Sequence, residues 1–175
     1  MALVQQNTNG TVDRANAYID VAAAKAYWAD RGVILSPTYS DAQIEVAIVT
    51  ATKYLDIRYN FKGYQLHRLQ GTQWPRGGVT SFLRGIPPAL EDATCALVTR
   101  VLSGKNLLPD PTVDISGQVV SEVTKKIGPI ETTTKFSESN KVGPTATLPE
   151  FPEVSLMLRA SRLIGSRNSG DLGRS

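Results

Sequence analysis

Apolar residues recur at helical spacing in three segments of the first hundred residues. The first segment follows Asp20, which can cap a helix, and ends before Gly32. The second follows a capping-box pattern that starts at Ser40, and the third opens at Pro87-Pro88 and ends at Gly104. We therefore predict three helices, with buried faces formed by Val21, Ala24 and Trp28, by Ile44, Ala47, Ile48, Ala51 and Leu55, and by Leu90, Ala93, Leu97 and Val101.

The pattern changes after residue 105, where frequent proline and glycine exclude long helices. Segments 119–127 and 130–136 are rich in Val, Ile and Thr, which predicts either a hairpin or one long extended arm. Residues 153–164 regain helical spacing with apolar residues on two sides, which is typical of a helix that lies between partners. The last segment, 165–175, is expected to be disordered unless another chain orders it.

Together these patterns predict a mainly α fold, a small helical bundle with a long extended or β-type arm and a separate C-terminal helix. The helical core is expected at 1–105 and includes an ordered glycine- and tryptophan-containing loop at 61–86. The arm or hairpin follows at 106–150, and a docking helix with a flexible tail at 151–175. An arm that cannot bury both faces by itself often pairs with a neighbour's strand edge. Contacts of this arm with other subunits are therefore predicted at Val119, Val120, Val123, Ile127 and Ile130.

Composition supports a globular protein, because 41% of the residues are hydrophobic and 20% are charged. No apolar run approaches the roughly 20 residues that span a bilayer, and the N-terminus lacks the segments of a signal peptide. We therefore expect no membrane partner and assembly in a cytoplasm. A lone cysteine, Cys95, lies in a helical pattern and is expected to be a small buried hydrophobe.

Residues that could organise catalysis or hold a metal are scarce. His67 is the one histidine, and no nucleophile motif accompanies it, so a structural or solvated role is expected. One His and one Cys exclude a zinc pattern, and the acidic residues do not follow calcium-loop spacing. Arg76-Gly77-Gly78 is not followed by the Gly-Lys-Ser/Thr of a phosphate-binding loop. We predict a protein that is not an enzyme and needs no metal and no cofactor.

Positive charge concentrates in the middle of the chain, where residues 51–105 hold eight Lys/Arg against three Asp/Glu. Such an excess is usually a solvated face, but here it alternates with aromatic residues, a mixture that can bind single-stranded DNA. The same aromatics could instead close the loop over the helices, and that interpretation is favoured. The possible DNA-facing residues are Lys53, Arg58, Lys62, Arg68, Arg76 and Arg84, interleaved with Tyr54, Tyr59, Phe61, Tyr64 and Trp74.

Several short segments, taken in order between about residues 15 and 132, resemble a family of tailed-phage head-tail connector (adaptor) proteins. Members of this family are often labelled DnaT-like single-strand DNA-binding proteins. The most specific segments are Phe61-Lys62-Gly63 and Trp74-Pro75-Arg76. The other matching segments are Ala17-Tyr18-Ile19, Ala26-Tyr27-Trp28-Ala29-Asp30-Arg31-Gly32, Ala51-Thr52-Lys53-Tyr54-Leu55-Asp56, Arg58-Tyr59, Ile86-Pro87, Ala93-Thr94-Cys95, Val120-Ser121-Glu122 and Gly128-Pro129-Ile130.

The resemblance implies a structural adaptor of the virion neck, packed as a dodecameric homo-oligomeric ring that docks on the portal and connects it to the tail. Double-stranded DNA would pass through the centre of such a ring, and a tail, nozzle or stopper protein would bind below it. Extended segments of these proteins grip neighbouring subunits or the tail component below, so the arm residues named above are also expected to contact the tail component, and C-terminal segments dock on the portal. The predicted portal-docking residues are Leu158, Arg159, Arg162, Leu163, Ile164 and Arg167. The alternative function is a single-stranded-DNA-binding module that uses basic and aromatic residues of 53–84.

Overall fold

A computed structural model describes residues 2–79, 85–109 and 148–164 with their side chains, and the backbone of 122–127 and 130–135. The described residues fall into two compact units. The first combines the part before residue 108 with the part from residue 150 onward, and the second lies within 108–149. The fold is mainly α, as the sequence predicted, with four helices and two short two-stranded sheets among the described residues.

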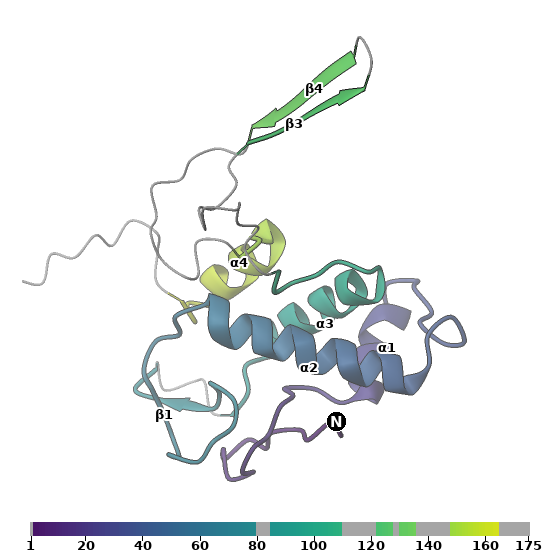
Figure 1. Ribbon diagram of the computed structural model, residues 1–175. Coiled ribbons are helices and arrows are strands. Elements are labelled where there is room, and N and C mark those ends of the chain that lie inside the picture. The colour runs from purple at the N-terminus through teal and green to yellow at the C-terminus, as the bar shows by residue number, and fades with distance from the viewer. Residues whose placement is uncertain (1, 80–84, 110–121, 128–129, 136–147, 165–175) are drawn as a thin grey trace, which may run out of the picture. The chain divides into compact units, whose positions relative to one another are not determined.

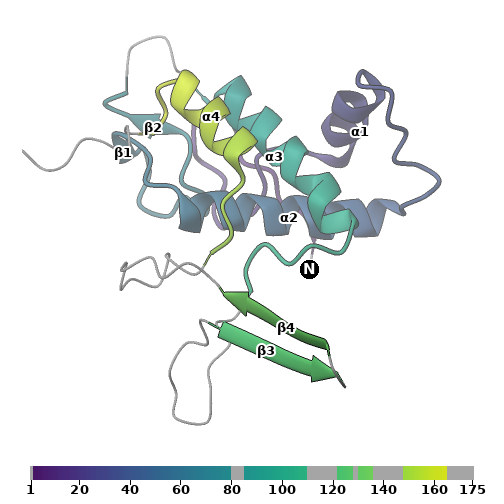
Figure 2. The same ribbon diagram turned by 90° about the horizontal axis from the view of Figure 1, so that it is seen from above.

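Three helices form the centre of the first unit, namely α1 (Val21–Ala29), α2 (Asp41–Arg58) and α3 (Pro88–Leu102). Figure 1 and Figure 2 show α2 running beside α3, with α1 at one end of the pair. All three predicted helices are thus confirmed, and so is the capping box, because Ser40 and Gln43 make both of its hydrogen bonds.

The core is built mainly from the facing sides of α2 and α3. Ile44, Ile48 and Leu55 of α2 are fully buried, as are Leu90 and Leu97 of α3. Each such side chain contributes about 1.5–3 kcal/mol through the hydrophobic effect. The predicted buried faces of these two helices are confirmed at the same positions, although Val101 near the end of α3 is only half-buried.

The loop after α2 contains a regular element that the sequence did not predict. Two short strands, β1 (Tyr64–Gln65) and β2 (Arg76–Gly77), pair antiparallel with Tyr64 opposite Gly77. Below them Trp74 is fully buried, and its ring meets the ring of Phe61 edge to face with centroids 6.0 Å apart. The prediction that aromatic residues fasten this loop to the helices is confirmed for Phe61 and Trp74.

The fourth helix, α4 (Pro152–Ala160), packs against α3 within the first unit, whereas the sequence predicted a separate helix. Val154 and Leu158 are fully buried there, while Leu156 on the other side is 63% exposed. The helix ends before the predicted limit at Ile164 because Arg162 has a φ of +58° in the left-handed region. One apolar side of this helix is therefore covered by the chain's own core.

In the second unit, β3 (Glu122–Ile127) and β4 (Ile130–Lys135) form an antiparallel hairpin. Its register runs from Glu122 opposite Lys135 to Ile127 opposite Ile130. Of the two predicted alternatives, a hairpin or one long extended arm, the hairpin is the one observed. No helix in the described part of the chain is long and apolar enough to cross a bilayer.

Candidate nucleic-acid interface

The end of α4 brings basic residues from two distant parts of the chain together. The backbone N–H of Lys62 donates a hydrogen bond to the carbonyl of Leu163 at 3.0 Å. Next to it, Phe61 and Ile164 form an antiparallel bridge. Lys62 of the loop and Arg162 of the segment after α4 therefore lie in adjacent backbone segments, and both side chains are exposed.

Arg76 holds the loop on one side of this junction. Its guanidinium donates from Nε to the carbonyl of Lys62 at 2.8 Å and from Nη2 to the carbonyl of Gly63 at 2.5 Å. It also donates from Nη1 to the side chain of Gln73 at 2.6 Å. These hydrogen bonds hold the loop in place and keep the charge of Arg76 near Lys62. Because most of its N–H donors are already bonded within the protein, few remain to bind a ligand.

Two further arginines lie in the last turns of the neighbouring helices, Arg58 in α2 and Arg159 in α4. Arg58 approaches the carboxylate of Glu150 at 3.7 Å, and Arg159 is half-buried on α4. The Nε atoms of both arginines are buried and have no hydrogen-bond partner among the described residues. A buried guanidinium N–H without a partner is costly, so each of these atoms favours a nearby acceptor such as water or an anion.

We call the four cations at the ends of α2 and α4 and on the two bonded segments that follow them, Arg58, Lys62, Arg159 and Arg162, the basic seam. It gathers four cations, and Glu150 is the one carboxylate that pairs with any of them in the described structure. A row of guanidinium and ammonium groups with incomplete pairing attracts polyanions, and phosphate oxygens are the acceptors that such groups bind best. The seam is therefore a candidate contact surface for a nucleic-acid backbone.

Not all the predicted DNA-facing residues belong to the seam. Lys53 is exposed on α2, and Arg68 is exposed at the tip of the loop between β1 and β2. Arg76 is committed to backbone carbonyls, as described above. Arg84 lies outside the described residues. The structure places Lys62 next to the segment that holds Arg162, which the sequence had assigned to portal docking together with Arg159.

The interleaved aromatics separate into two classes. Tyr54, Tyr59, Phe61 and Trp74 are buried, so their rings are not available to stack on bases. The hydroxyl of Tyr59, for example, lies 2.8 Å from that of Ser155 inside the α2–α4 contact. Tyr64 differs from the rest, because 65% of its surface is exposed. The interpretation that aromatics close the loop is thus confirmed for Phe61 and Trp74, whereas Tyr54 and Tyr59 pack towards Phe151 and Ser155.

A buried carboxylate supports the loop from beneath. Asp56 of α2 accepts hydrogen bonds from the hydroxyl of Tyr18 and, at 3.2 Å, from the backbone N–H of Gln73. Burial raises the pKa of Asp56 to about 7, although Tyr18, Gln73 and the charge of Arg76 all act in the opposite direction. The same burial and the neighbouring carboxylate raise the pKa of Tyr18.

The residues predicted to dock on a portal occupy contrasting positions. Leu158 and Leu163 are fully buried and Ile164 nearly so, which means that the chain's own core already covers these three side chains. Arg159 and Arg162 reach the surface and belong to the basic seam. Arg167 lies outside the described residues. A portal contact on the two arginines stays a prediction.

The predicted contact arm coincides in part with the hairpin. Val123, Ile127 and Ile130 lie in β3 and β4, where Val123 pairs with Thr134 and Ile127 with Ile130. Val119 and Val120 lie outside the described residues. The contacts of this arm with another subunit or with a tail component stay a prediction.

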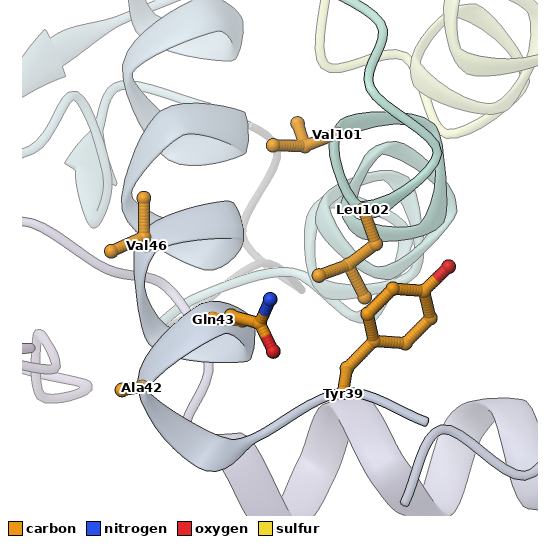
Figure 3. A pocket seen from close by; sticks show the side chains of 6 residues that line it. All are labelled: Tyr39, Ala42, Gln43, Val46, Val101 and Leu102. Carbon is orange, nitrogen blue, oxygen red and sulfur yellow. The ribbon is translucent and has the colours of Figure 1, made fainter.

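Other features of the described surface do not offer a phosphate site of this kind. An apolar groove of about 450 Å³ lies between the start of α2 and the end of α3, and none of its lining residues is charged (Figure 3). Its lining consists of Tyr39, Ala42, Gln43, Val46, Val101 and Leu102. His67 is exposed in a smaller cleft of about 210 Å³ beside Asp13 and Arg68. Among the described residues no group of three or more His, Cys, Asp or Glu is placed to hold a metal ion.

The lone thiol is also accounted for. Cys95 is buried in α3, where its backbone carbonyl accepts a hydrogen bond from Trp28 Nε1 at 2.9 Å. Burial, with smaller effects from Asp92 and Glu91, raises the pKa of Cys95 to about 12. The nucleophilic thiolate is therefore scarce near neutral pH, as expected for a core residue.

Comparison with known families gives one match, and it spans residues 1–173. The matching family is described as "Putative DnaT-like ssDNA binding protein". The chain belongs to this family. The match extends the resemblance found in the sequence over nearly the whole chain, whereas the family description speaks of DNA binding and does not mention a phage adaptor. Neither the comparison with curated proteins nor the comparison with solved structures finds a match.

For this member of the family, the sequence identified half of the basic seam. Arg58 and Lys62 stood out because basic and aromatic residues alternate around them. Arg159 and Arg162 were noticed as charges on a two-sided helix, but the place of Arg162 beside Lys62 depends on a backbone contact between residues about 100 positions apart. No local pattern encodes such a contact.

Proposed function

We propose that this protein binds single-stranded DNA, with the basic seam as its contact to the phosphate backbone. The observation that carries the proposal is the hydrogen bond from Lys62 to Leu163, which joins the basic segment after α2 to the basic segment at the end of α4. The description of its family supports the same class of ligand. We also propose that the protein acts by binding and has no catalytic activity of its own.

Binding through the seam depends on salt in a defined way. Neutralising a phosphate releases condensed counterions, so the logarithm of affinity falls linearly with the logarithm of salt concentration. For single strands, each phosphate contact contributes about 0.7 to that slope. The slope measured with the wild-type chain therefore gives the total number of phosphate contacts, and the change of slope in a variant shows whether the replaced residue makes one of them.

The test measures fluorescence anisotropy of a labelled oligothymidine across a salt series. Lys62→Gln and Arg159→Gln each remove one seam charge, and each is expected to weaken binding and reduce the slope by about 0.7. Lys105→Gln is the matched control, because Lys105 is an exposed cation just after α3 and outside the seam. Negligible binding of the wild type at low salt would reject the function, and equal losses in all three variants would reject the seam.

A second candidate function is favoured by a different observation, the isolated hairpin β3–β4. In the described structure its sheet contains these two strands alone, so the outer edge of each strand has no strand partner there. A two-stranded hairpin is marginally stable by itself in water, and open edges pair readily with strands of other chains. This supports the head-tail adaptor proposed from the sequence, a dodecameric ring in the virion neck between portal and tail, with double-stranded DNA through its centre.

Electron microscopy of the chain mixed with a portal protein tests the adaptor function. Rings seated on the portal are the expected result, and a doubly substituted hairpin, Thr124→Pro with Thr133→Pro, should prevent ring formation because these paired positions lose backbone donors. Persistent monomers of the wild type would contradict this function while leaving single-strand binding untouched.

A further inference from the structure

Tyr64 is a large aromatic residue held on the surface by a shelf of glycine backbone. It lies on β1, opposite Gly77 of β2, and 65% of its surface is exposed. A Cβ atom built on Gly77 would lie 2.9 Å from both Cε2 and Cζ of the tyrosine ring. One built on Gly78 would lie 3.0 Å from Cε1. The ring therefore rests in the space that side chains at these two positions would occupy.

This shelf depends on glycine at both positions. Contacts below 3.0 Å are not tolerated between a Cβ atom and a ring, so alanine at position 77 would push the tyrosine away. Gly78 has a φ of +72°, which is a conformation that other residues rarely adopt. The glycine pair thus covers part of the ring and limits its motion, and most of the side chain remains open to solvent.

The surroundings of the ring are positively charged. Lys62 lies two residues before Tyr64, and the guanidinium of Arg76 is bonded to the carbonyls of Lys62 and Gly63. Lys62 in turn belongs to the basic seam. An exposed aromatic ring in a hairpin that also carries Lys62 and Arg76 has the features of a surface that stacks an unpaired base while nearby cations hold its phosphates.

We propose that Tyr64 on its shelf of Gly77 and Gly78 is a base-stacking platform that holds one unpaired base of a single strand. This inference rests on the proposed single-strand binding and adds to it the residue that distinguishes single strands from duplexes. Bases of a duplex are already stacked on one another, so the platform is useful only for a strand whose bases are free. The ring is already positioned, so little side-chain freedom is lost when a base stacks on it.

The test uses labelled oligothymidine and a duplex of the same length, measured by fluorescence anisotropy. Tyr64→Leu keeps an apolar side chain but removes the ring, and it is expected to weaken single-strand binding roughly 5- to 150-fold. Tyr64→Phe keeps the ring and is expected to bind within about twofold of the wild type. Duplex binding and the salt slope should be unchanged in both variants, because neither loses a phosphate contact.

Two further variants separate stacking from other causes. Gly77→Ala leaves Tyr64 in the chain but displaces its ring, so it should reproduce the loss seen with Tyr64→Leu, with folding verified by circular dichroism. Tyr39→Leu is the control, because Tyr39 lines the apolar groove between α2 and α3. It should bind as the wild type does.

The possible results distinguish the platform from the function on which it rests. If Tyr64→Leu binds single strands as tightly as the wild type does, the platform is overturned and binding through the seam survives. If Tyr64→Phe loses as much affinity as Tyr64→Leu, the hydroxyl rather than the ring face is used, and the platform is again overturned. If the wild type binds neither strand form at low salt, the proposed function itself fails.

Discussion

Asp56 is a carboxyl group whose protonation the fold shifts into the physiological pH range. Burial raises its pKa from an ordinary 3.8 to about 7. Between these two values the folded state holds a proton that the unfolded state has released. The free energy of unfolding therefore falls as pH rises through this window, and the effect is complete above about pH 7.

Replacing Asp56 by asparagine should remove this pH dependence. We expect the wild type to lose stability relative to Asp56→Asn between about pH 5 and pH 8, by a few kcal/mol at most. Asparagine retains an oxygen that can accept from Tyr18 and carries no charge to desolvate. Urea unfolding of both proteins at the two pH values is the measurement. Parallel stability profiles would show that Asp56 titrates at its ordinary pKa in the folded state.

At the scale of single residues, burial separates aromatic and basic residues that hold the loop in place from those that are exposed to solvent. Trp74 and Phe61 complete the core beneath the loop, whereas Tyr64 reaches solvent three residues after Phe61. Arg76 is occupied by backbone carbonyls, whereas Lys62 next to it is exposed. Residue type alone would have predicted that all of these residues contact DNA.

Among the elements, α4 was predicted to lie between partners because it is apolar on two sides, but one of these sides packs against the core of its own chain. Its Leu158 is fully buried in the first unit, and the hydroxyl of Ser155 meets that of Tyr59 at 2.8 Å. The other side exposes Leu156. The helix is therefore partly available to a partner, but only on the Leu156 side.

Two leucines of α4 provide a matched test of this packing. Leu158→Ala should lower the free energy of unfolding by about 2–5 kcal/mol, because it leaves a cavity against α3. Leu156→Ala should change it by less than about 0.5 kcal/mol, because that side chain is largely solvated. Chemical unfolding followed by tryptophan fluorescence compares them. Similar small effects in both variants would mean that α4 is not part of the core in solution.

On the scale of the whole molecule, the division into two units is the feature with the clearest consequence. The helical unit has its own core of α2, α3 and α4, and the hairpin lies in the other unit. A core that excludes the hairpin should unfold independently of it.

The doubly substituted hairpin, Thr124→Pro with Thr133→Pro, tests this independence. We expect the unfolding midpoint of the helical unit to stay at the wild-type value, as monitored by the tryptophans at positions 28 and 74. The buried position of Trp74 makes it a reporter of the first unit. A marked fall in the midpoint would indicate that the hairpin contributes to the helical core.

The sequence by itself determined the helices and the extended character of 122–135, because caps, glycine stops and hydrophobic spacing act between residues that are close along the chain, whereas it left the choice between a hairpin and one long arm open. Ser40 with Gln43, Pro88 and Gly104 set boundaries that the structure reproduces. Tertiary structure decided which surface each element presents. The bond from Lys62 to Leu163 places Arg162 beside Lys62, and the glycine pair at 77 and 78 selects Tyr64 as the exposed ring. Such contacts form only when the core brings distant segments together, so no local pattern records them.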